Sequence, residues 1–182
     1  MRCSWVDENC EVYVRYHDEE WGKPVHDDRK LFEMLILEGF QAGLSWLTVL
    51  KKRPAFRKEF AGFEPEKAAE FDEEKIEKML QNPQIIRSRQ KICAAVGNAK
   101  VFLQIQLEFG SFDKYLWHFT NGKTQKYNIF PCPVKNELSD TISKDLKKRG
   151  MKYVGSVIIY SYLQAVGVID DHEPQCFCHA KN

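Results

Sequence analysis

The sequence predicts an all-α protein, and three features support this fold class. Apolar residues recur at helical spacing along much of the chain, no stretch alternates convincingly as a half-buried strand does, and candidate N-cap residues and glycines flank the apolar segments. Hydrophobic residues make up 43% of the 182 positions, enough to bury a core in one compact domain or in two small lobes.

The first strong helical segment carries a carboxylate on its apolar face. Asp27 offers an N-cap, and Leu31, Met34, Leu35 and Glu38 then follow the i, i+3, i+4, i+7 spacing of a buried stripe. A carboxylate in such a place must be paired, protonated or free to bind a cation. Two interpretations follow from the pattern: Glu38 bonds backbone donors at the helix end, or it belongs to a binding site.

Aromatic residues precede this helix and a glycine-rich connection follows it. Residues 1–26 hold four large aromatic side chains that either cap the core or line a pocket: Trp5, Tyr13, Tyr16 and Trp21. Gly39 and Gly43 interrupt the helical pattern, so we expect residues 40–44 to form a short connection, after which Ser45 can cap a second helix. We expect Pro54 to end that helix.

The middle of the chain predicts further helices without a functional signal. Residues 56–80 suggest two short amphipathic helices, and Pro83 is expected to open a long core helix that buries Cys93. Residues 112–119 predict another short helix, and the turn-rich residues 122–133 predict a loop.

Two helices near the C-terminal end are separated by a tight turn. Ser139 can cap the first, which ends at Gly150, and the second begins near Gly155 and closes at Gly167. Backbone N–H groups at the second helix start, flanked by Lys and Arg, would suit a phosphate. The alternative is a solvated helix end with charges that favour the helix dipole. The basic residues of this segment are Lys144, Lys147, Lys148, Arg149 and Lys152.

Charge and hydropathy narrow the class of protein. The net charge is only +1, which taken alone argues weakly against a nucleic-acid-binding protein, although the distribution of charge matters more than its sum. No apolar run approaches the length of a membrane span, and the N-terminal residues lack the apolar core of a signal peptide. We therefore expect a cytoplasmic protein with no membrane partner.

The six cysteines gather unevenly with histidines. Cys3 and Cys10 lie near His17 at one end of the sequence, and Cys176 and Cys178 lie near His172 and His179 at the other. In an intracellular protein this pattern favours thiols or metal ligands over a disulfide framework.

Several motifs, in this order from end to end, resemble the DNA-3-methyladenine glycosylase I family of the helix-hairpin-helix superfamily. They are CSW, YHDEEWG, LFEMLILEGFQAGLSW, LKKRGMKYVG and DHEPQC. The turn Met151–Gly155 is similar to the LPGVG turn of that superfamily and departs from it at Lys152 and Tyr153. The resemblance implies an all-α fold over residues 1–182, a single glycosylase domain of two helical lobes with a base pocket between them, and chain ends joined by a structural zinc.

The resemblance also implies an activity and a set of site residues. Members excise 3-methyladenine from alkylated double-stranded DNA by hydrolysing the N-glycosidic bond, leave an abasic site and free base, and have no lyase step; we expect a monomer. Glu38 and Tyr16 would recognise the cationic base, Trp46 would stack on it, and Tyr13, Trp5 and Trp21 would complete an aromatic wall. The residues implied to contact DNA are Gly43, Leu44, Lys152, Tyr153, Val154 and Gly155.

The zinc ligands implied by the family are Cys3, His17, His172 and Cys176. Two thiolates and two imidazoles form a closed tetrahedral set, which is typical of structural zinc. Cys176 fits the His-x-x-x-Cys spacing, while Cys178 and His179 are substitutes. The run Asp170-Asp171-His172 resembles the V-D-x-H context of the superfamily's catalytic aspartate, but members of this family do not depend on that aspartate, so Asp170 is expected to be a decoy and Asp171 structural.

Two other functions fit the same residues. A zinc hydrolase would need an open coordination position on the Cys and His cluster. A zinc-stapled helical module would recognise distorted DNA without releasing a base.

Overall fold

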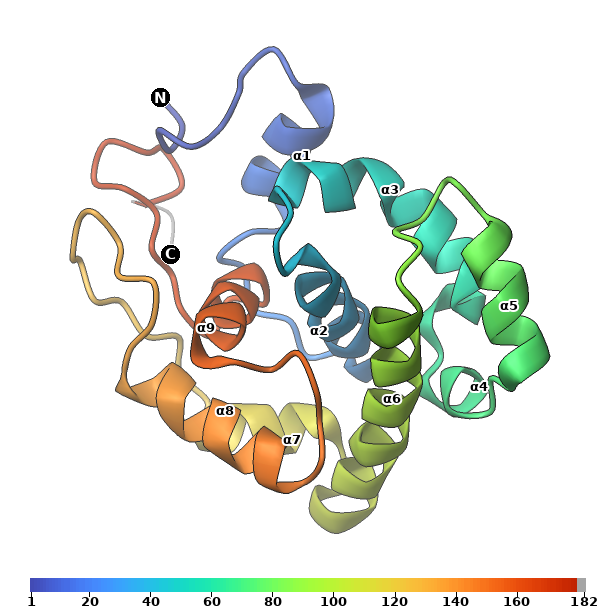
Figure 1. Ribbon diagram of the computed structural model, residues 1–182. Helices are drawn as coiled ribbons and strands as arrows, with labels where there is room; N and C mark the ends of the chain where they lie inside the picture. Colours follow the sequence, from blue (N-terminus) through green and yellow to red (C-terminus); the bar gives the residue numbers. More distant parts are fainter. Residues whose placement is uncertain (180–182) are drawn as a thin grey trace.

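The structure is a computed structural model that describes residues 1–179, and its regular elements are helices (Figure 1). Within this range, the backbone pairing of strands is limited to one parallel bridge between Gln125 and Ile169. The predicted all-α class is therefore confirmed. In chain order the helices are α1 (Glu11–Glu19), α2 (Asp28–Gln41), α3 (Trp46–Glu59), the short 3₁₀ helix η1 (Ala61–Phe63), α4 (Pro65–Ala69), α5 (Glu73–Gln81), α6 (Arg89–Phe109), α7 (Phe112–His118), α8 (Glu137–Lys148) and α9 (Ser156–Ala165).

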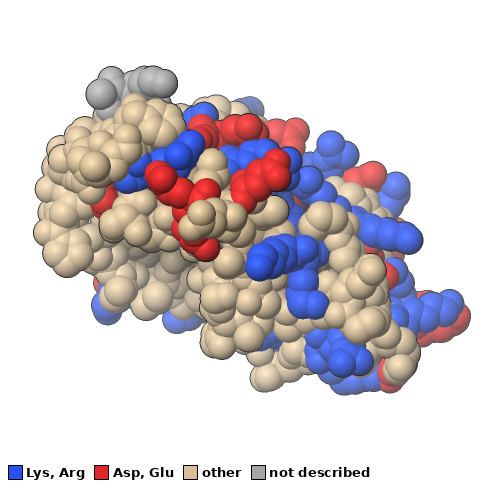
Figure 2. All heavy atoms as spheres, turned by 90° about the horizontal axis from the view of Figure 1, so that it is seen from above, with Lys and Arg blue, Asp and Glu red and all other residues tan. Residues whose placement is uncertain are grey.

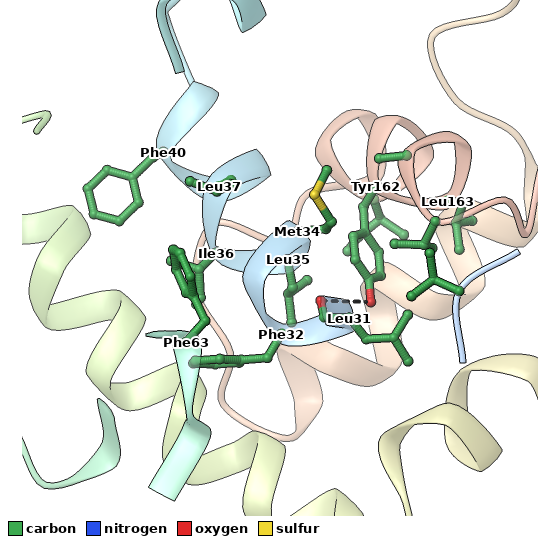
Figure 3. Packing of buried hydrophobic residues seen from close by; sticks show 14 of the residues in the cluster. Leu31, Phe32, Met34, Leu35, Ile36, Leu37, Phe40, Phe63, Tyr162 and Leu163 are labelled. Atoms are coloured by element: carbon green, nitrogen blue, oxygen red, sulfur yellow. Dashed lines mark hydrogen bonds between the residues drawn. The ribbon is translucent and has the colours of Figure 1, made fainter. Parts of the chain in front are cut away.

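Helix α2 lies in the middle of the fold and is buried on nearly every side. It begins where the Asp27 side chain accepts a hydrogen bond from Lys30 N. Figure 3 shows Tyr162 of α9 against one face of α2, where its hydroxyl donates to Leu31 O at 3.2 Å, and Phe63 against the other. Each fully buried Leu, Ile, Met or Phe contributes about 1.5–3 kcal/mol to folding, so α2 is the helix around which the core is assembled.

Helix α3 continues past Pro54, contrary to the predicted end before that residue. A proline inside a helix removes one hydrogen bond and costs about 3 kcal/mol. Pro54 lies on the exposed side of α3, whereas Arg53 and Phe56 beside it are buried. Tertiary contacts on the buried side therefore maintain the helix that local preference would stop.

Other boundaries also differ from the prediction. Helix α2 continues through Gly39 to Gln41, past the predicted start of the connection at residue 40. Helix α6 begins at Arg89, capped by Ser88, because Asn82 Oδ1 accepts from Gln84 N and holds the residues after Pro83 in a turn. Helix α1 forms within the aromatic N-terminal segment, where no helix was predicted. Helix α8 is capped by Asn136, with Ser139 as the returning member of a capping box.

The predicted burial of Cys93 is wrong, because its side chain is exposed on α6. The buried stripe of α6 includes the adjacent Ile92 and Ala94. A residue between two stripe positions of a long helix turns toward solvent when only one side of that helix meets the core.

The two ends of the described chain lie side by side (Figure 1). Phe177 N donates to Met1 O at 3.0 Å, and the Ser4 hydroxyl donates to Glu173 Oε1 at 2.5 Å. Gly167, after α9, lies against the segment before α2, and a Cβ at this position would come within 2.1 Å of the Lys23 carbonyl carbon. This close approach needs glycine and fixes the N-terminal segment to α9.

A buried ion network joins the first three helices. Arg53 of α3 donates to both carboxylate oxygens of Glu20 at 2.9 Å and to Glu33 Oε1 of α2 at 2.7 Å. Arg57 also binds Glu33, but its side chain is 52% exposed.

Among residues 1–179, none of the helices has the length and apolar character needed to span a membrane.

Replacing Arg53 by Met should destabilise the protein by about 3–5 kcal/mol, because Glu20 and Glu33 then lose a buried cationic partner. Arg57→Met removes a largely exposed partner of the same Glu33 and should cost less than about 1 kcal/mol. Urea unfolding of both variants measures the difference. Equal losses would show that the buried network does not stabilise this end of the fold.

Candidate active site

A cavity of about 330 Å³ opens between the N-terminal segment, α2, the start of α3 and α9. The six predicted base-binding residues all line it: Trp5, Tyr13, Tyr16, Trp21, Glu38 and Trp46. A concave site with aromatic walls and a few polar groups is the usual form of a small-molecule pocket.

Glu38 is a buried carboxyl group that lines this cavity. Its residue is 3% exposed, and its Oε2 atom has no hydrogen-bond partner among residues 1–179. Burial raises the pKa of the Glu38 carboxyl to about 8. The interpretation of Glu38 as a helix-end cap is therefore wrong, and the carboxyl is free to accept a ligand in the cavity.

Aromatic rings surround this carboxyl. Tyr16 of α1 and Trp46 of α3 lie with ring centroids 5.5 Å apart and planes inclined at 56°. Trp5 packs edge-on against Tyr13 at 5.0 Å and against Trp21 at 5.1 Å. Such rings offer negative faces to a cation and flat faces to a planar ring.

The cavity also presents hydrogen-bond donors. The indole nitrogens of Trp5 and Trp46 are buried without a partner in the described part of the chain. Burial, and next the nearby Glu38 carboxyl, raise the pKa of Tyr16 well above its usual value, so its hydroxyl remains a donor at neutral pH. The site can therefore bind a flat, cationic ring that carries polar edges.

Asp171, which was expected to be a structural residue, lies on the opposite wall of the cavity. Asp171 is buried, and its Oδ2 atom accepts hydrogen bonds from the Tyr160 hydroxyl at 2.6 Å and from Gln164 Nε2 at 2.8 Å. Its Oδ1 atom lines the cavity without a partner in residues 1–179. Asp170 instead contacts His172 Nδ1 at 2.7 Å and Lys126 at 3.3 Å, away from the cavity lining.

A cluster of potential metal ligands lies where the chain ends meet. His17, His172, Cys176 and Cys178 are buried, and their ligating atoms lie within 4.8 Å of one another. Asp18 contacts His17 Nδ1 at 2.8 Å, just as Asp170 contacts His172 Nδ1, so both rings are left with Nε2 as the free ligating atom. His172 Nε2 is buried with no hydrogen-bond partner in the described residues.

Cys3 lies beside this cluster and is 2% exposed. Its backbone N is 3.4 Å from His17 Nε2, and its Sγ atom accepts a hydrogen bond from Glu173 N at 3.4 Å. Burial raises the pKa of the Cys3 thiol, with the neighbouring Cys176 adding to that effect. Of the predicted ligands, the structure thus brings together His17, His172 and Cys176. The fourth member of the cluster is Cys178, and the predicted ligand Cys3 lies beside it. All six cysteines are free thiols.

The residues predicted to contact DNA lie on two turns. Gly43 has a φ of +79°, and Leu44 is 41% exposed on the connection between α2 and α3, so Leu44 does not pack inside. In the turn between α8 and α9, Lys152 is exposed and Tyr153 is half-buried with a φ of +56°. Val154 is 1% exposed, so its side chain belongs to the core and only its backbone could face a ligand.

Charges are unevenly distributed on the surface. Figure 2, which views the molecule from above the orientation of Figure 1, shows Lys and Arg side chains spread over one half of this face and a compact group of Asp and Glu near its centre. The near-neutral total charge therefore conceals basic areas.

Comparison with known proteins identifies the family. The sequence model of the methyladenine glycosylase family matches residues 5–179. DNA-3-methyladenine glycosylase 1 of Escherichia coli (strain K12) is 46% identical over 184 residues, covering 100% of this chain and 98% of the relative.

Solved structures agree with this match. A crystal structure of 3-methyladenine DNA glycosylase I superposes with a TM-score of 0.93 at 46% identity, covering 98% of this chain and 99% of the other. A Y16F variant of 3-methyladenine DNA glycosylase I, in complex with 3-methyladenine, superposes with a TM-score of 0.93 at 37% identity, covering 97% and 96%. The chain described here therefore belongs to the methyladenine glycosylase family, in its DNA-3-methyladenine glycosylase I group.

Proposed function

We propose that this enzyme excises 3-methyladenine from alkylated double-stranded DNA by hydrolysing the N-glycosidic bond, which leaves an abasic site. The observation that carries the proposal is the unpartnered, buried Glu38 carboxyl inside an aromatic cavity. Methylation at N3 gives the adenine a positive charge, which weakens its bond to the sugar and lets it leave as a neutral base. A carboxylate with aromatic faces around it selects that cation over ordinary adenine.

Each residue of the cavity has a separate role in this proposal. The flipped base stacks on Trp46, Glu38 accepts hydrogen bonds from its polar edge, and the Tyr16 hydroxyl donates to the site. Tyr13, Trp5 and Trp21 exclude water around the base, which strengthens each of these interactions. No lysine lines the cavity among residues 1–179. Without an amine nucleophile to form a Schiff base, the reaction is limited to hydrolysis and has no lyase step.

Binding to DNA uses the two turns outside the cavity. Helices α8 and α9 with residues 151–155 form the helix-hairpin-helix, whose backbone N–H groups and Lys152 bind phosphates. Leu44 enters the duplex and fills the space of the extruded nucleotide, as apolar wedges do in proteins that unstack bases. In this proposal residues 1–182 act as a monomeric single domain, with the base pocket between two helical lobes.

A structural zinc joins the two chain ends. The donor set fits the ion, because both imidazoles are oriented by carboxylates and His172 Nε2 is left without a partner. We assign Cys3, His17, His172 and Cys176 as ligands, since Cys3 lies against Cys176 and comes from the opposite end of the chain. When bound, zinc supplies stability and takes no part in the reaction.

Glu38→Gln tests the assigned function. Wild-type protein should release free 3-methyladenine from methylated duplex DNA, measured by chromatography, and the variant should bind the free base at least about tenfold more weakly because a charge-assisted contact is lost. Glu19→Gln, on the exposed side of α1, is the matched control and should behave as wild type.

Four outcomes would contradict this assignment. A folded wild-type protein that releases no base would not be this enzyme, and one that only binds lesion DNA would be a recognition module. Activity lost on zinc removal while the fold is retained would favour a zinc hydrolase. Unchanged affinity of Glu38→Gln would remove this residue from base recognition.

Stability should depend on pH through Glu38. Its pKa is 4.5 in its ordinary state and about 8 when folded, so unfolding releases a proton between these pH values and rising pH favours the unfolded chain. Glu38→Gln has no such proton and should gain stability relative to wild type by about 3–5 kcal/mol from pH 4.5 to 8. Urea unfolding across this range measures it, and parallel curves for the two proteins would show that Glu38 titrates normally.

The zinc assignment is tested by metal content. Cys3→Ser should lower the zinc found by elemental analysis and lower Tm, because one thiolate is lost and the ends of the chain are no longer joined. Cys178→Ser should retain zinc. Retention in Cys3→Ser with loss in Cys178→Ser would assign the fourth ligand to Cys178, and the absence of zinc from the wild-type protein would reject the site.

A further inference from the structure

The two turns assigned to DNA are both hydrogen-bonded to the same helix. One is the entering loop, residues 42–45 between α2 and α3, and the other is the hairpin turn, residues 151–155 between α8 and α9. Helix α6 carries a side chain that binds each of them: Lys91 for the entering loop and Asn98 for the hairpin turn. They are seven positions apart and so lie on one face of α6.

Lys91 holds the point at which α2 ends and the entering loop begins. Its Nζ atom donates to Phe40 O at 2.9 Å and to Ala42 O at 2.6 Å. The last turn of α2 contains no basic residue of its own. Carbonyl groups at the end of a helix lack intrahelical partners, and Lys91 supplies them with a cationic donor from another element.

Asn98 holds the hairpin turn by its backbone. Its Nδ2 donates to Lys152 O and its Oδ1 accepts from Lys152 N, both at 2.8 Å. Asn98 is 5% exposed, so these bonds are largely shielded from water. They fix the residue directly before Tyr153, which adopts a φ of +56°. A left-handed conformation at tyrosine is maintained only where neighbouring contacts enforce it.

Tyr153 connects the two holding points. Its ring lies 5.9 Å from Lys91 Nζ in a cation–π contact. A Cβ on Gly39 of α2 would lie 3.4 Å from the Tyr153 Cβ, so the hairpin turn rests directly on the last turns of α2. The cavity left among these residues has a volume of only about 10 Å³. The entering loop, α6 and the hairpin turn thus form one closely packed unit.

We propose that Lys91 and Asn98 are positioning residues that fix the entering loop relative to the hairpin turn. This inference rests on the proposed function, in which the hairpin turn binds phosphates and Leu44 enters the base stack. Phosphate contacts set the register of the protein on the duplex, so the wedge reaches the damaged nucleotide only if the two turns hold a fixed separation. A misplacement of about 1 Å can reduce a rate about a hundredfold.

Neither positioning residue belongs to the base cavity. Lys91 and Asn98 do not line this cavity. Two of the three N–H groups of the Lys91 ammonium donate hydrogen bonds to backbone carbonyls of the protein itself. Their loss should therefore weaken extrusion of the nucleotide and leave recognition of the free base intact. An ordinary phosphate-binding lysine would instead act through its charge alone.

The experiment uses a duplex with a tetrahydrofuran abasic analogue opposite 2-aminopurine, whose fluorescence rises when a wedge unstacks it. Leu44→Ala should abolish that rise. Lys91→Met should reduce it at least about threefold and lower kcat/KM on methylated duplex about tenfold, while the calorimetric Kd for free 3-methyladenine stays within about twofold. Lys91→Arg, which can still donate to both carbonyls, should recover most of the signal.

Lys100→Met is the matched control, since Lys100 is exposed on the same helix and its removal costs the same charge. Asn98→Asp tests the second holding point, because the carboxylate keeps the acceptor for Lys152 N and loses the donor to Lys152 O. It should reduce the fluorescence rise as Lys91→Met does.

Several results would overturn the inference. If Lys91→Met and Lys100→Met had the same effect, the loss would be an effect of charge alone. If Lys91→Met lost affinity for free 3-methyladenine, the loss would be a structural effect on the pocket. An unchanged rise in Asn98→Asp would reject the second holding point. Since the fluorescence assay needs no base release, a wild-type protein that inserts its wedge but excises nothing would refute the proposed function and leave this inference standing.

Discussion

The burial of one carboxyl group without a counter-ion governs the design of the site. An ionised Glu38 in this place would cost several kcal/mol, so at neutral pH the group holds a proton until a cation arrives. A neutral purine cannot compensate for ionising it, whereas a methylated, cationic one can. Under the proposed function, selectivity for the cationic purine therefore arises because the fold holds the Glu38 carboxyl where its ionisation is unfavourable without a cation.

The fold maintains that state from two directions. Helix α2, enclosed by the core, prevents Glu38 from turning to water, and the network of Arg53 with Glu20 and Glu33 anchors α1 and α3 on either side. The remaining lining comes from α9, from residues 132–134 and from the two chain ends, which have little regular structure of their own. Their contacts at Gly167 and in the His and Cys cluster hold this wall in place.

The sequence allowed the central features to be predicted because they appear as local conflicts. Glu38 breaks an apolar stripe, and the aromatic residues around position 16 exceed what a surface segment needs; both proved to line the cavity. Predictions from local sequence patterns were wrong where tertiary packing determines the structure. Pro54 does not end α3, since its buried neighbours hold the helix, and Cys93 is exposed because α6 meets the core on one side only.

Other contacts could not be predicted from local patterns, even where the residue itself had been noticed. Asp171 lines the cavity only because Tyr160 and Gln164, one and two turns along α9, hold its other oxygen. Nothing in the residue types near Lys91 indicates that its ammonium group reaches a loop about fifty positions earlier in the chain. Such contacts depend on the crossing of helices, which a sequence pattern does not specify.

The placement of tryptophan gives the protein an optical property of its own. Of its four tryptophans, Trp5, Trp21 and Trp46 line the base cavity, while Trp117 donates its indole N–H to Val25 O elsewhere in the core. Three of the four tryptophans thus lie at the site where a purine would stack. A ligand stacked against them would change their fluorescence, so occupancy can be followed without any attached dye.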